Sequence, residues 1–338
     1  KRYSNKYSKY KEKIRSMKFN NVYIEREILK SFYTKNILDK INYGKIILCD
    51  KYSEVFNPKN QNFRIQKMNP NIILAKKRKK LIFKTPEDYT IGFEKNFYFS
   101  HMLNCVYDCS YCFLQGMFNS ANYLVFVNYE DYFKEIEKII KTNTNNRICF
   151  FSGYDCDSLA LDYLTNFVTN FVDFFSRYQN AFLEIRTKSV NIKPLFKFKP
   201  SKNIIIAYSI NPQSVIEKFE EKTPNFEKRL NALKKIQEKG WNIGLRFDPI
   251  FISKKNKNEY LIFLERIFSK LDCSLIHSVT IGKFRMPEVF LKKIIKIRPE
   301  DSYNFTNFIK NNIEEEMMIK HFYSNIEKYV NKNKIFYN

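Results

Sequence analysis

The segment FEKRLNALKKIQEKGWNIGLRF, residues 226–247, is the clearest guide to the fold because it joins an amphipathic helix to an apolar strand. Leu230, Leu233 and Ile236 recur at helical spacing, and lysines and glutamates cover the opposite face. Gly240 is a typical residue at the end of a helix, and the NIGLRF stretch after it is typical of a buried strand. The segment therefore predicts a helix that packs on a sheet and leads directly into one of its strands.

Segments of these two kinds alternate along most of the chain. Apolar, strand-like runs lie at residues 95–99, 147–152, 181–187, 203–209, 242–247 and 278–282. Segments with helical spacing lie at residues 129–141, 157–178, 189–196, 225–239, 257–271 and 286–296. Six units in which a strand precedes a helix predict a parallel sheet with right-handed crossovers. The expected fold is α/β, either a partial (β/α)6 TIM-like barrel or an open doubly wound sheet.

The two ends of the chain differ from this alternating region. Residues 1–90 are basic and rich in aromatic residues, and their weak periodicity predicts irregular structure. Residues 299–338 are polar, with helical spacing and an aromatic end. We therefore expect a basic N-terminal extension over residues 1–92, a partial barrel over 93–290 and a C-terminal helical cap over 291–338.

The charge of the chain favours a polyanionic partner. Its 338 residues carry 59 Lys and Arg against 35 Asp and Glu, which gives a formal net charge of +24. An excess of this size is typical of nucleic-acid-binding proteins, although AT-biased coding would also enrich lysine. The run LAKKRKKLIF, residues 74–83, makes Lys77, Arg78 and Lys79 candidate phosphate contacts. A solvated loop and a targeting signal are the alternative interpretations of this run.

Cysteine usage and hydropathy indicate the cellular compartment. The seven cysteines are odd in number and four of them are scattered, which does not fit the disulfide framework of a secreted domain. No stretch approaches about eighteen uninterrupted apolar residues, and the first residues lack the apolar core of a secretory signal. We expect a cytoplasmic protein with reduced thiols and no membrane partner.

Three of the cysteines are crowded into HMLNCVYDCSYCFLQGMF, residues 101–118. Cys105, Cys109 and Cys112 form a C-x3-C-x2-C pattern directly after the first predicted strand of the alternating series. Barrels of this kind place their chemistry at the carboxyl ends of their strands. Three thiolates can hold three irons of a [4Fe–4S] cluster and leave the fourth iron open to a small molecule. Zinc is the competing metal, because His101 would complete a Cys3His ligand set.

The cysteine pattern, with Tyr111 between its last two cysteines, resembles the radical S-adenosylmethionine (SAM) superfamily, and CSYCFLQ resembles the spore photoproduct lyase family within it. The resemblance continues in order through YLVFVN, LDYLT, RTKSV, YSINPQSVIEKFEEKTP, KRLNALKKIQEKGWNIGLRFDPIFI and HSVTIGKFRMP, and it covers about residues 93–290. It implies a partial (β/α)6 TIM-like barrel of the radical SAM type with N-terminal and C-terminal extensions.

The resemblance also implies cofactors and partners. A [4Fe–4S] cluster on the three cysteines and S-adenosyl-L-methionine would supply a 5′-deoxyadenosyl radical, which splits a thymine dimer photoproduct in DNA. An electron donor such as flavodoxin or ferredoxin is expected. The cofactor-binding candidates are Lys188, Ser209, Asn211 and Asp157, and Arg285 joins the candidates for DNA contact.

Two positions depart from the family pattern. Alignment on LDYLT places Tyr154 where the family has a hydrogen-donating cysteine, and Cys156 lies two residues later, so either is a candidate donor. A family tyrosine after the last cluster cysteine is Phe113 here, which has no O–H, although Tyr111 remains a candidate for radical transfer. Two alternatives stay open: the same radical chemistry on a different substrate, and a zinc-stabilised nucleic-acid-binding protein.

Overall fold

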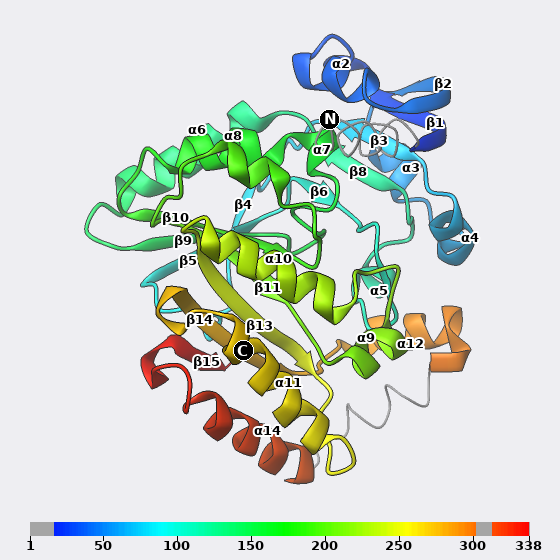
Figure 1. Cartoon of the computed structure of the whole chain (residues 1–338). Coiled ribbons are helices and arrows are strands. Elements are labelled where there is room, and N and C mark those ends of the chain that lie inside the picture. Colours follow the sequence, from blue (N-terminus) through cyan, green and yellow to red (C-terminus); the bar gives the residue numbers. More distant parts are fainter. Residues whose placement is uncertain (1–16, 302–312, 338) are drawn as a thin grey trace, which may run out of the picture.

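The centre of the molecule is a curled sheet of eight strands, seen in a computed structural model that describes residues 17–301 and 313–337 (Figure 1). The strands in spatial order are β15 (Ile335–Tyr337), β14 (Ile276–Lys283), β13 (Asn242–Ile250), β11 (Ile204–Ser209), β10 (Ala181–Thr187), β9 (Ile148–Ser152), β5 (Lys95–Phe99) and β4 (Ile82–Lys84). All six predicted strands, from β5 to β14, are neighbours in chain order and run parallel. A doubly wound sheet would reverse its strand order partway across, so the prediction of a partial (β/α)6 barrel is confirmed.

Helices between the strands pack on this sheet. α8 (Phe167–Phe175) contacts β10, and α10 (Phe226–Glu238) contacts β11 and β13. At the start of α10 the Asn225 side chain accepts a hydrogen bond from the Lys228 N–H at 3.0 Å, and Gly240 beyond its end adopts φ +88°. The predicted apolar stripe of α10 is buried, so this element forms as its sequence predicts.

Two predicted helices differ in detail. The segment 157–178 is divided into α7 (Asp162–Thr165) and α8, because Asn166 between them adopts a left-handed φ of +52°. The segment 189–196 holds only a 3₁₀ helix, η2 (Lys193–Lys197). Further helices are η1 (Arg26–Ile28), α2 (Phe32–Leu38), α3 (Ser53–Phe56), α4 (Phe63–Met68), α5 (Leu114–Met117), α6 (Tyr129–Thr142), α9 (Gln213–Phe219), α11 (Lys257–Lys270), η3 (Cys273–Leu275), α12 (Glu288–Ile297), η4 (Pro299–Asp301), α14 (Ile313–Ile326) and η5 (Lys332–Lys334).

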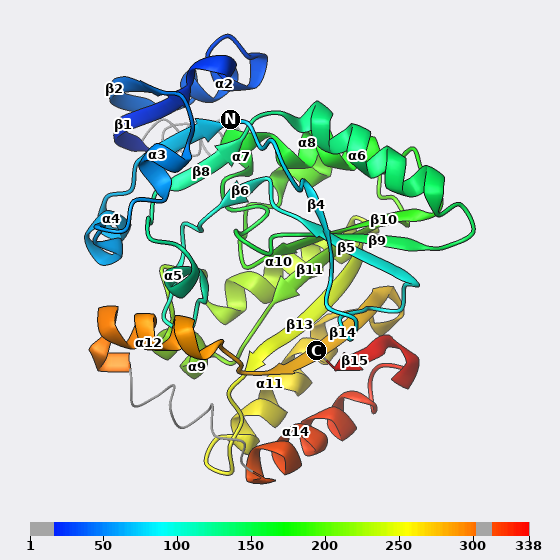
Figure 2. The ribbon, with the colours of Figure 1, turned by 180° about the vertical axis from the view of Figure 1, so that it is seen from behind.

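The N-terminal region forms a second sheet, so the expectation of irregular structure is wrong for residues 17–90. Its strand order is β2 (Asn42–Cys49), β1 (Lys18–Glu25), β3 (Ile72–Ala75), β8 (Tyr123–Phe126) and β6 (Met102–Leu103). Figures 1 and 2 show this sheet at one end of the molecule and α14 at the other. The sequence hides these strands because Asn and Lys interrupt β1 at its exposed positions. Because β6 and β8 follow β5 in the chain, the sheet draws on both sides of the expected boundary at residue 92.

The C-terminal part adds a helix and a strand. α14 packs on α11, and β15 extends the central sheet by pairing in parallel with β14. Residues 302–312, inside the expected helical cap, lie outside the described residues. The division of the chain at residues 92 and 290 stays a prediction. In the two described ranges, every helix is too short or too polar to cross a membrane.

Candidate cofactor site at the three-cysteine loop

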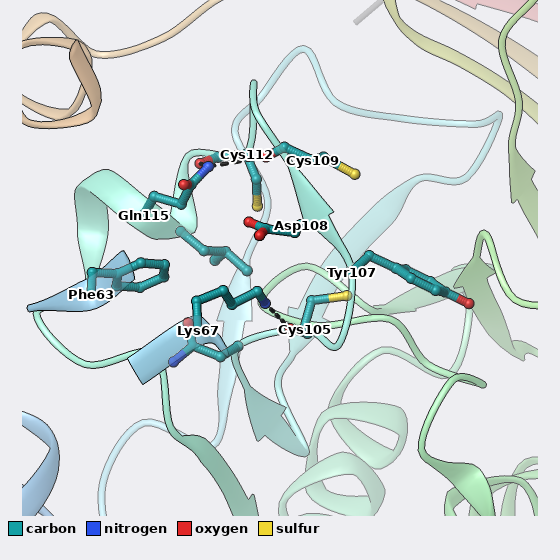
Figure 3. Close-up of a pocket in the computed structure, with 10 residues that line it drawn as sticks. Phe63, Lys67, Cys105, Tyr107, Asp108, Cys109, Cys112 and Gln115 are labelled. Atoms are coloured by element: carbon teal, nitrogen blue, oxygen red, sulfur yellow. Dashed lines mark hydrogen bonds between the residues drawn. The ribbon is translucent and has the colours of Figure 1, made fainter. Parts of the chain in front are cut away.

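The three cysteines lie in the loop that follows β5, at the carboxyl end of that strand. Within this loop β7 (Asp108–Cys109) is a two-residue strand, and α5 follows the last cysteine. Figure 3 shows Cys105, Cys109 and Cys112 around a small cavity that Phe63 and Lys67 of α4 also line. All seven cysteines of the chain are thiols. The structure therefore gathers the three candidate ligands in one place, and their role as cluster ligands stays a prediction.

Side chains from several elements fix the backbone of this loop. The Lys67 ammonium donates a hydrogen bond to the Cys105 carbonyl. The Gln115 side-chain amide donates to the carbonyls of Cys109 and Ser110 at 3.0 and 3.2 Å. β7 also pairs with β12 (Glu220–Glu221), which ties the loop to the segment after α9. Because these backbone groups are satisfied within the protein, the loop that carries the three thiols is held in place.

Asp108, between the first two cysteines, connects the loop to both ends of the chain. Its buried carboxylate pairs with Arg64 of α4 at 2.7 Å, with Arg298 beyond α12 at 2.5 Å and with Lys222 at 3.6 Å. Burial opposes ionisation of Asp108, but Arg64 and Arg298 outweigh it and lower its pKa. The carboxylate therefore stays ionised and binds N-terminal, central and C-terminal segments together around the cysteines.

The cysteine environment fits a cluster better than a zinc ion. Burial raises the pKa of all three thiols, that of Cys105 to about 12, so thiolates there need a strong positive partner such as a metal centre. Among the described residues, no three His, Cys, Asp or Glu side chains converge to hold a single metal ion. Zinc needs its ligands around one atom, whereas each thiolate on a [4Fe–4S] cluster binds a separate iron.

His101, the candidate fourth zinc ligand, contacts other groups. Its ring stacks on Phe167 with the centroids 4.1 Å apart, and its Nδ1 lies 4.0 Å from Sγ of Cys156. Burial lowers the pKa of His101 to about 3, so the imidazole is neutral at physiological pH. The geometry gives no support to a Cys3His zinc site.

A buried carboxylate, Glu220, joins the cysteine loop to the strand ends of the barrel. It accepts hydrogen bonds from the Tyr111 O–H, the Asn211 side-chain amide at 3.0 Å and the Arg229 guanidinium. Glu220 and Arg229 form an ion pair with both side chains fully buried. Burial opposes the charge of Glu220, but Arg229 and Lys188 outweigh it and lower its pKa. Glu220 thus brings together side chains from the cysteine loop, from the loop after β11 and from α10.

Sequence analysis missed Glu220, although α10 carries a signal for it. Arg229 lies on the same helical face as Leu233 and Ile236, which are buried. A cation on an apolar stripe requires a buried partner of opposite charge. The pattern therefore predicts a buried carboxylate, but it does not tell which of the many acidic residues supplies it.

Two SAM-binding candidates approach the cysteine loop from neighbouring strands. Lys188 follows β10, and its ammonium lies 5.4 Å from the centroid of the Tyr111 ring. Asn211 follows β11, and its Oδ1 is buried without a hydrogen-bond partner among the described residues. An unsatisfied buried acceptor is costly unless a ligand donates to it. The residues present therefore fit a bound SAM beside the cysteines.

The other two cofactor candidates are engaged with the protein itself. Ser209 Oγ accepts a hydrogen bond from Nε of Arg186 at 3.2 Å. The Asp157 carboxylate accepts hydrogen bonds from the Thr187 hydroxyl at 2.7 Å and from the Lys188 N–H at 2.6 Å, besides two N–H groups of its own turn. Asp157 thus fixes the turn that carries Lys188.

Tyr154, one candidate hydrogen donor, lies at the rim of the barrel. Its side chain is 45% exposed, and its ring contacts Tyr98 and Phe113 at centroid distances of 4.6 and 5.6 Å. Burial of part of the ring raises the pKa of its phenol, and the Arg285 guanidinium is near enough to oppose this shift. Tyr154 therefore shares the rim with a DNA-binding candidate.

Cys156, the other candidate donor, is buried in a different environment. It is 8% exposed and belongs to an apolar cluster with Val22, Ile24 and Leu164, where the N-terminal sheet meets α7. Burial raises the pKa of its thiol. The structure thus separates the two candidates that the sequence left equivalent.

The four candidate DNA-binding side chains differ in their exposure and in their contacts within the protein. Arg285 and Lys79 are exposed. Lys77 is partly buried, with its ammonium 5.4 and 5.1 Å from the centroids of two phenylalanine rings. Arg78 is exposed as well, but it pairs with two carboxylates of the N-terminal region, each at 2.9 Å. Part of the charge of the basic run is therefore neutralised by acidic residues of the same chain.

Comparison with known proteins places the chain in a family. A family model described as spore photoproduct lyase matches residues 17–336. The chain belongs to the spore photoproduct lyase family. The predicted resemblance, which was based on residues 93–290, therefore extends over nearly the whole chain.

Individual relatives agree with this assignment. Spore photoproduct lyase of Bacillus subtilis (strain 168) is 26% identical over 266 residues, which cover 77% of this chain and 75% of the relative. The protein of that name from Clostridium acetobutylicum is 21% identical over 283 residues, which cover 79% of this chain and 82% of the relative. A solved spore photoproduct lyase double mutant with bound AdoMet and dinucleoside spore photoproduct has the same fold, with a TM-score of 0.74 and 18% identity over 94% of this chain and 98% of that one. The predicted assignment to the radical SAM lyases is confirmed.

Proposed function

We propose that this family member uses SAM to split a thymine dimer photoproduct in DNA. The observation that carries the proposal is the cysteine loop at the end of β5, together with Lys188 beside Tyr111 and with Asn211 Oδ1, which is buried without a hydrogen-bond partner in the part of the chain that the structure describes. A site for a cluster is thereby combined with an acceptor and a cation that suit an amino-acid-like ligand. Membership of the spore photoproduct lyase family supports the same substrate class.

In this proposal Cys105, Cys109 and Cys112 hold a [4Fe–4S] cluster. Cluster and SAM, when bound, supply the 5′-deoxyadenosyl radical that starts the reaction. The Lys188 ammonium pairs with a ligand carboxylate, and Asn211 Oδ1 accepts a hydrogen bond from a ligand amino or hydroxyl group. Glu220 accepts hydrogen bonds from both Asn211 and Tyr111 and so holds Asn211 beside the cysteine loop.

We assign the return of hydrogen to the substrate to Tyr154 rather than to Cys156. The phenol is on the rim, where DNA can reach it, whereas the thiol is covered by the N-terminal sheet. A phenolic O–H can donate a hydrogen atom to a carbon radical, so the replacement of cysteine by tyrosine preserves the chemistry. Tyr111, buried and bonded to Glu220, is proposed to take part in radical transfer, for which Phe113 has no suitable group.

DNA is proposed to approach the rim that carries Tyr154 and Arg285. Arg285 and Lys79 contact phosphates directly, and Lys77 and Arg78 contribute through the positive potential of the N-terminal region. The formal net charge of +24 supports a polyanionic substrate. We further propose a cytoplasmic location, where thiols stay reduced, and a small electron carrier such as flavodoxin or ferredoxin as reductant.

The test is an anaerobic repair assay. Reconstituted protein is incubated with SAM, dithionite and an oligonucleotide that contains the thymine dimer photoproduct. We expect restored thymines and about four irons per chain, with both lost in Cys109→Ala and both retained in the matched control Cys273→Ala. About one zinc and no iron would instead identify the zinc-stabilised binding protein.

A second outcome of this assay would support a different substrate. Release of 5′-deoxyadenosine without restored thymine would keep the radical chemistry and exclude the photoproduct. The observation that favours this alternative is Tyr154 at the place of the family's hydrogen-donating cysteine.

A further inference from the structure

Exposed apolar side chains gather on the helices that flank the cysteine loop. Ile65 and Met68 on α4 are 61% and 73% exposed, Met117 on α5 is 38% exposed and Val289 on α12 is 76% exposed. α4, α5 and α12 follow one another along one side of the molecule in Figures 1 and 2. We call these four side chains the α4–α12 patch. Large apolar side chains this exposed, on helices that lie along one side of the molecule, are typical of interaction surfaces.

The patch is firmly connected to the loop behind it. α4 reaches the loop through Arg64, which pairs with Asp108, and through Lys67, which bonds the Cys105 carbonyl. α12 lies against α5 so closely that a Cβ at Gly116 would be 2.5 Å from a side-chain atom of Phe290. A protein seated on the patch would therefore be separated from the cysteines by little more than these short helices.

We propose that the α4–α12 patch is the docking surface for the electron donor, a small acidic protein that carries one electron at a time. The proposal rests on the proposed function, because only a redox centre at the cysteines needs such a partner. The rate of electron transfer falls steeply with the distance between the two redox centres. The donor must therefore dock close to the cysteine loop. In each encounter one electron leaves the reduced flavin of the donor, which passes from hydroquinone to semiquinone, and the cluster that the three cysteines would hold is the group that would accept it.

The charges around the patch fit an acidic partner. Lys296 is exposed on α12, and Lys59 is exposed just before α4. The acidic residue of α12, Glu288, is neutralised by its pairing with Lys292 at 2.6 Å. An apolar centre with a charged rim is the usual composition of a transient protein interface, and opposite charges on the rim accelerate association. A surface that binds DNA would instead carry clustered cations and would not need exposed methionine and valine side chains.

Charge substitutions on the patch test the proposal. Met68→Glu and Val289→Glu place a carboxylate on the first and last helix of the patch, and both positions are exposed enough for the fold to tolerate it. Phe32→Glu on α2 and Ile262→Glu on α11 are matched controls, 72% and 57% exposed and away from the loop. SAM cleavage is measured with reduced flavodoxin and separately with dithionite. Binding of oxidised flavodoxin, which needs no turnover, is measured by calorimetry.

We expect both patch variants to bind oxidised flavodoxin about tenfold more weakly and to lose flavodoxin-driven cleavage by a similar factor. Their dithionite-driven cleavage stays at the wild-type rate, and the controls behave like wild type throughout. Unchanged flavodoxin affinity in the patch variants, or an equal loss in the controls, overturns the proposal. Weaker binding of an oligonucleotide with unchanged flavodoxin affinity also overturns it and assigns the patch to DNA. If wild type fails to repair with dithionite, the proposed function fails, while the flavodoxin titration still decides the docking surface.

Discussion

Tyr154 and Cys156 are two residues apart in the chain but lie in different surroundings. The Tyr154 ring packs against Tyr98 and Phe113 and is partly exposed, whereas Cys156 is buried in an apolar cluster with residues of the N-terminal sheet. Strand β9 ends before both residues, so neither position is fixed by strand periodicity. The direction of each side chain comes from the turn after β9 and from the packing of the N-terminal sheet on that turn.

Replacement of Tyr154 by Phe tests the assignment of the donor. The ring contacts remain, but the O–H is lost, so we expect photoproduct repair to fall at least about tenfold while SAM cleavage continues. Cys156→Ala, the matched change at the buried candidate, should leave repair within about twofold of wild type. Product analysis of repaired oligonucleotide and 5′-deoxyadenosine measures both. Greater loss of repair in Cys156→Ala than in Tyr154→Phe would assign the donor to the thiol.

His101 makes the stability of the protein depend on pH. Its pKa is about 3 in the folded protein and about 6.5 when unfolded, because burial disfavours the imidazolium. The unfolded chain therefore binds the extra proton first, and the contribution of His101 to stability, complete above pH 6.5, is lost as the pH falls toward 3. Between pH 7.5 and pH 5 this costs about 2 kcal/mol.

Urea unfolding of the cluster-free protein at pH 7.5 and pH 5 measures this effect. His101→Phe, which can keep the stacking on Phe167, should lose less stability than wild type over that interval. His321→Phe is the control, because that histidine is exposed on α14. An equal loss in wild type and His101→Phe would show that His101 is not the group responsible.

At the scale of elements, α5 and α12 meet at a glycine. A Cβ at Gly116 would lie 2.5 Å from Cβ and 2.7 Å from Cα of Phe290, so any side chain there displaces the backbone of α12. Lys293 strengthens the same contact by donating a hydrogen bond to the Phe118 carbonyl at 3.0 Å. The absence of a side chain at position 116 is what lets the C-terminal helix cover the cysteine loop.

Gly116→Ala tests this contact. Overpacking against the Phe290 backbone should destabilise the protein by about 1–3 kcal/mol and lower the iron retained after reconstitution. Thermal unfolding and iron analysis measure the two effects. Met117→Ala, next to it and partly exposed, is the control and should change stability by less than about 1 kcal/mol. Wild-type stability in Gly116→Ala would mean that α12 adjusts without cost.

The whole molecule carries a positive charge that governs its binding to DNA. With a formal net charge of +24, affinity for an oligonucleotide should fall steeply as salt rises, because bound phosphates release counterions. Arg285→Ala should weaken binding and reduce the slope of log affinity against log salt by about 1. Lys138→Ala, on the exposed side of α6, should leave the slope unchanged. Fluorescence anisotropy at several salt concentrations measures this. Equal slopes for Arg285→Ala and wild type would remove Arg285 from the DNA interface.

The sequence was informative wherever a pattern is local. The six strands of the partial barrel and helix α10 follow from residues within a few positions of one another, so periodicity suffices to predict them. The spacing of Cys105, Cys109 and Cys112 is local too, and one short loop gathers them. The predicted family, with its radical SAM chemistry, depended on these same short motifs.

Only the tertiary structure decided which distant residues meet. Asp108 pairs with Arg64 and Arg298, and Glu220 reaches back to Tyr111, across separations that no periodic pattern spans. The N-terminal sheet takes β8 from beyond the cysteine loop, and that sheet in turn covers Cys156 and leaves Tyr154 at the rim. Such contacts are selected by the packing of the whole chain, in which a buried charge must find its partner and an apolar face its cover. For that reason amino-acid order alone defined the chemistry of this protein, while folding defined the arrangement of the groups that carry it out.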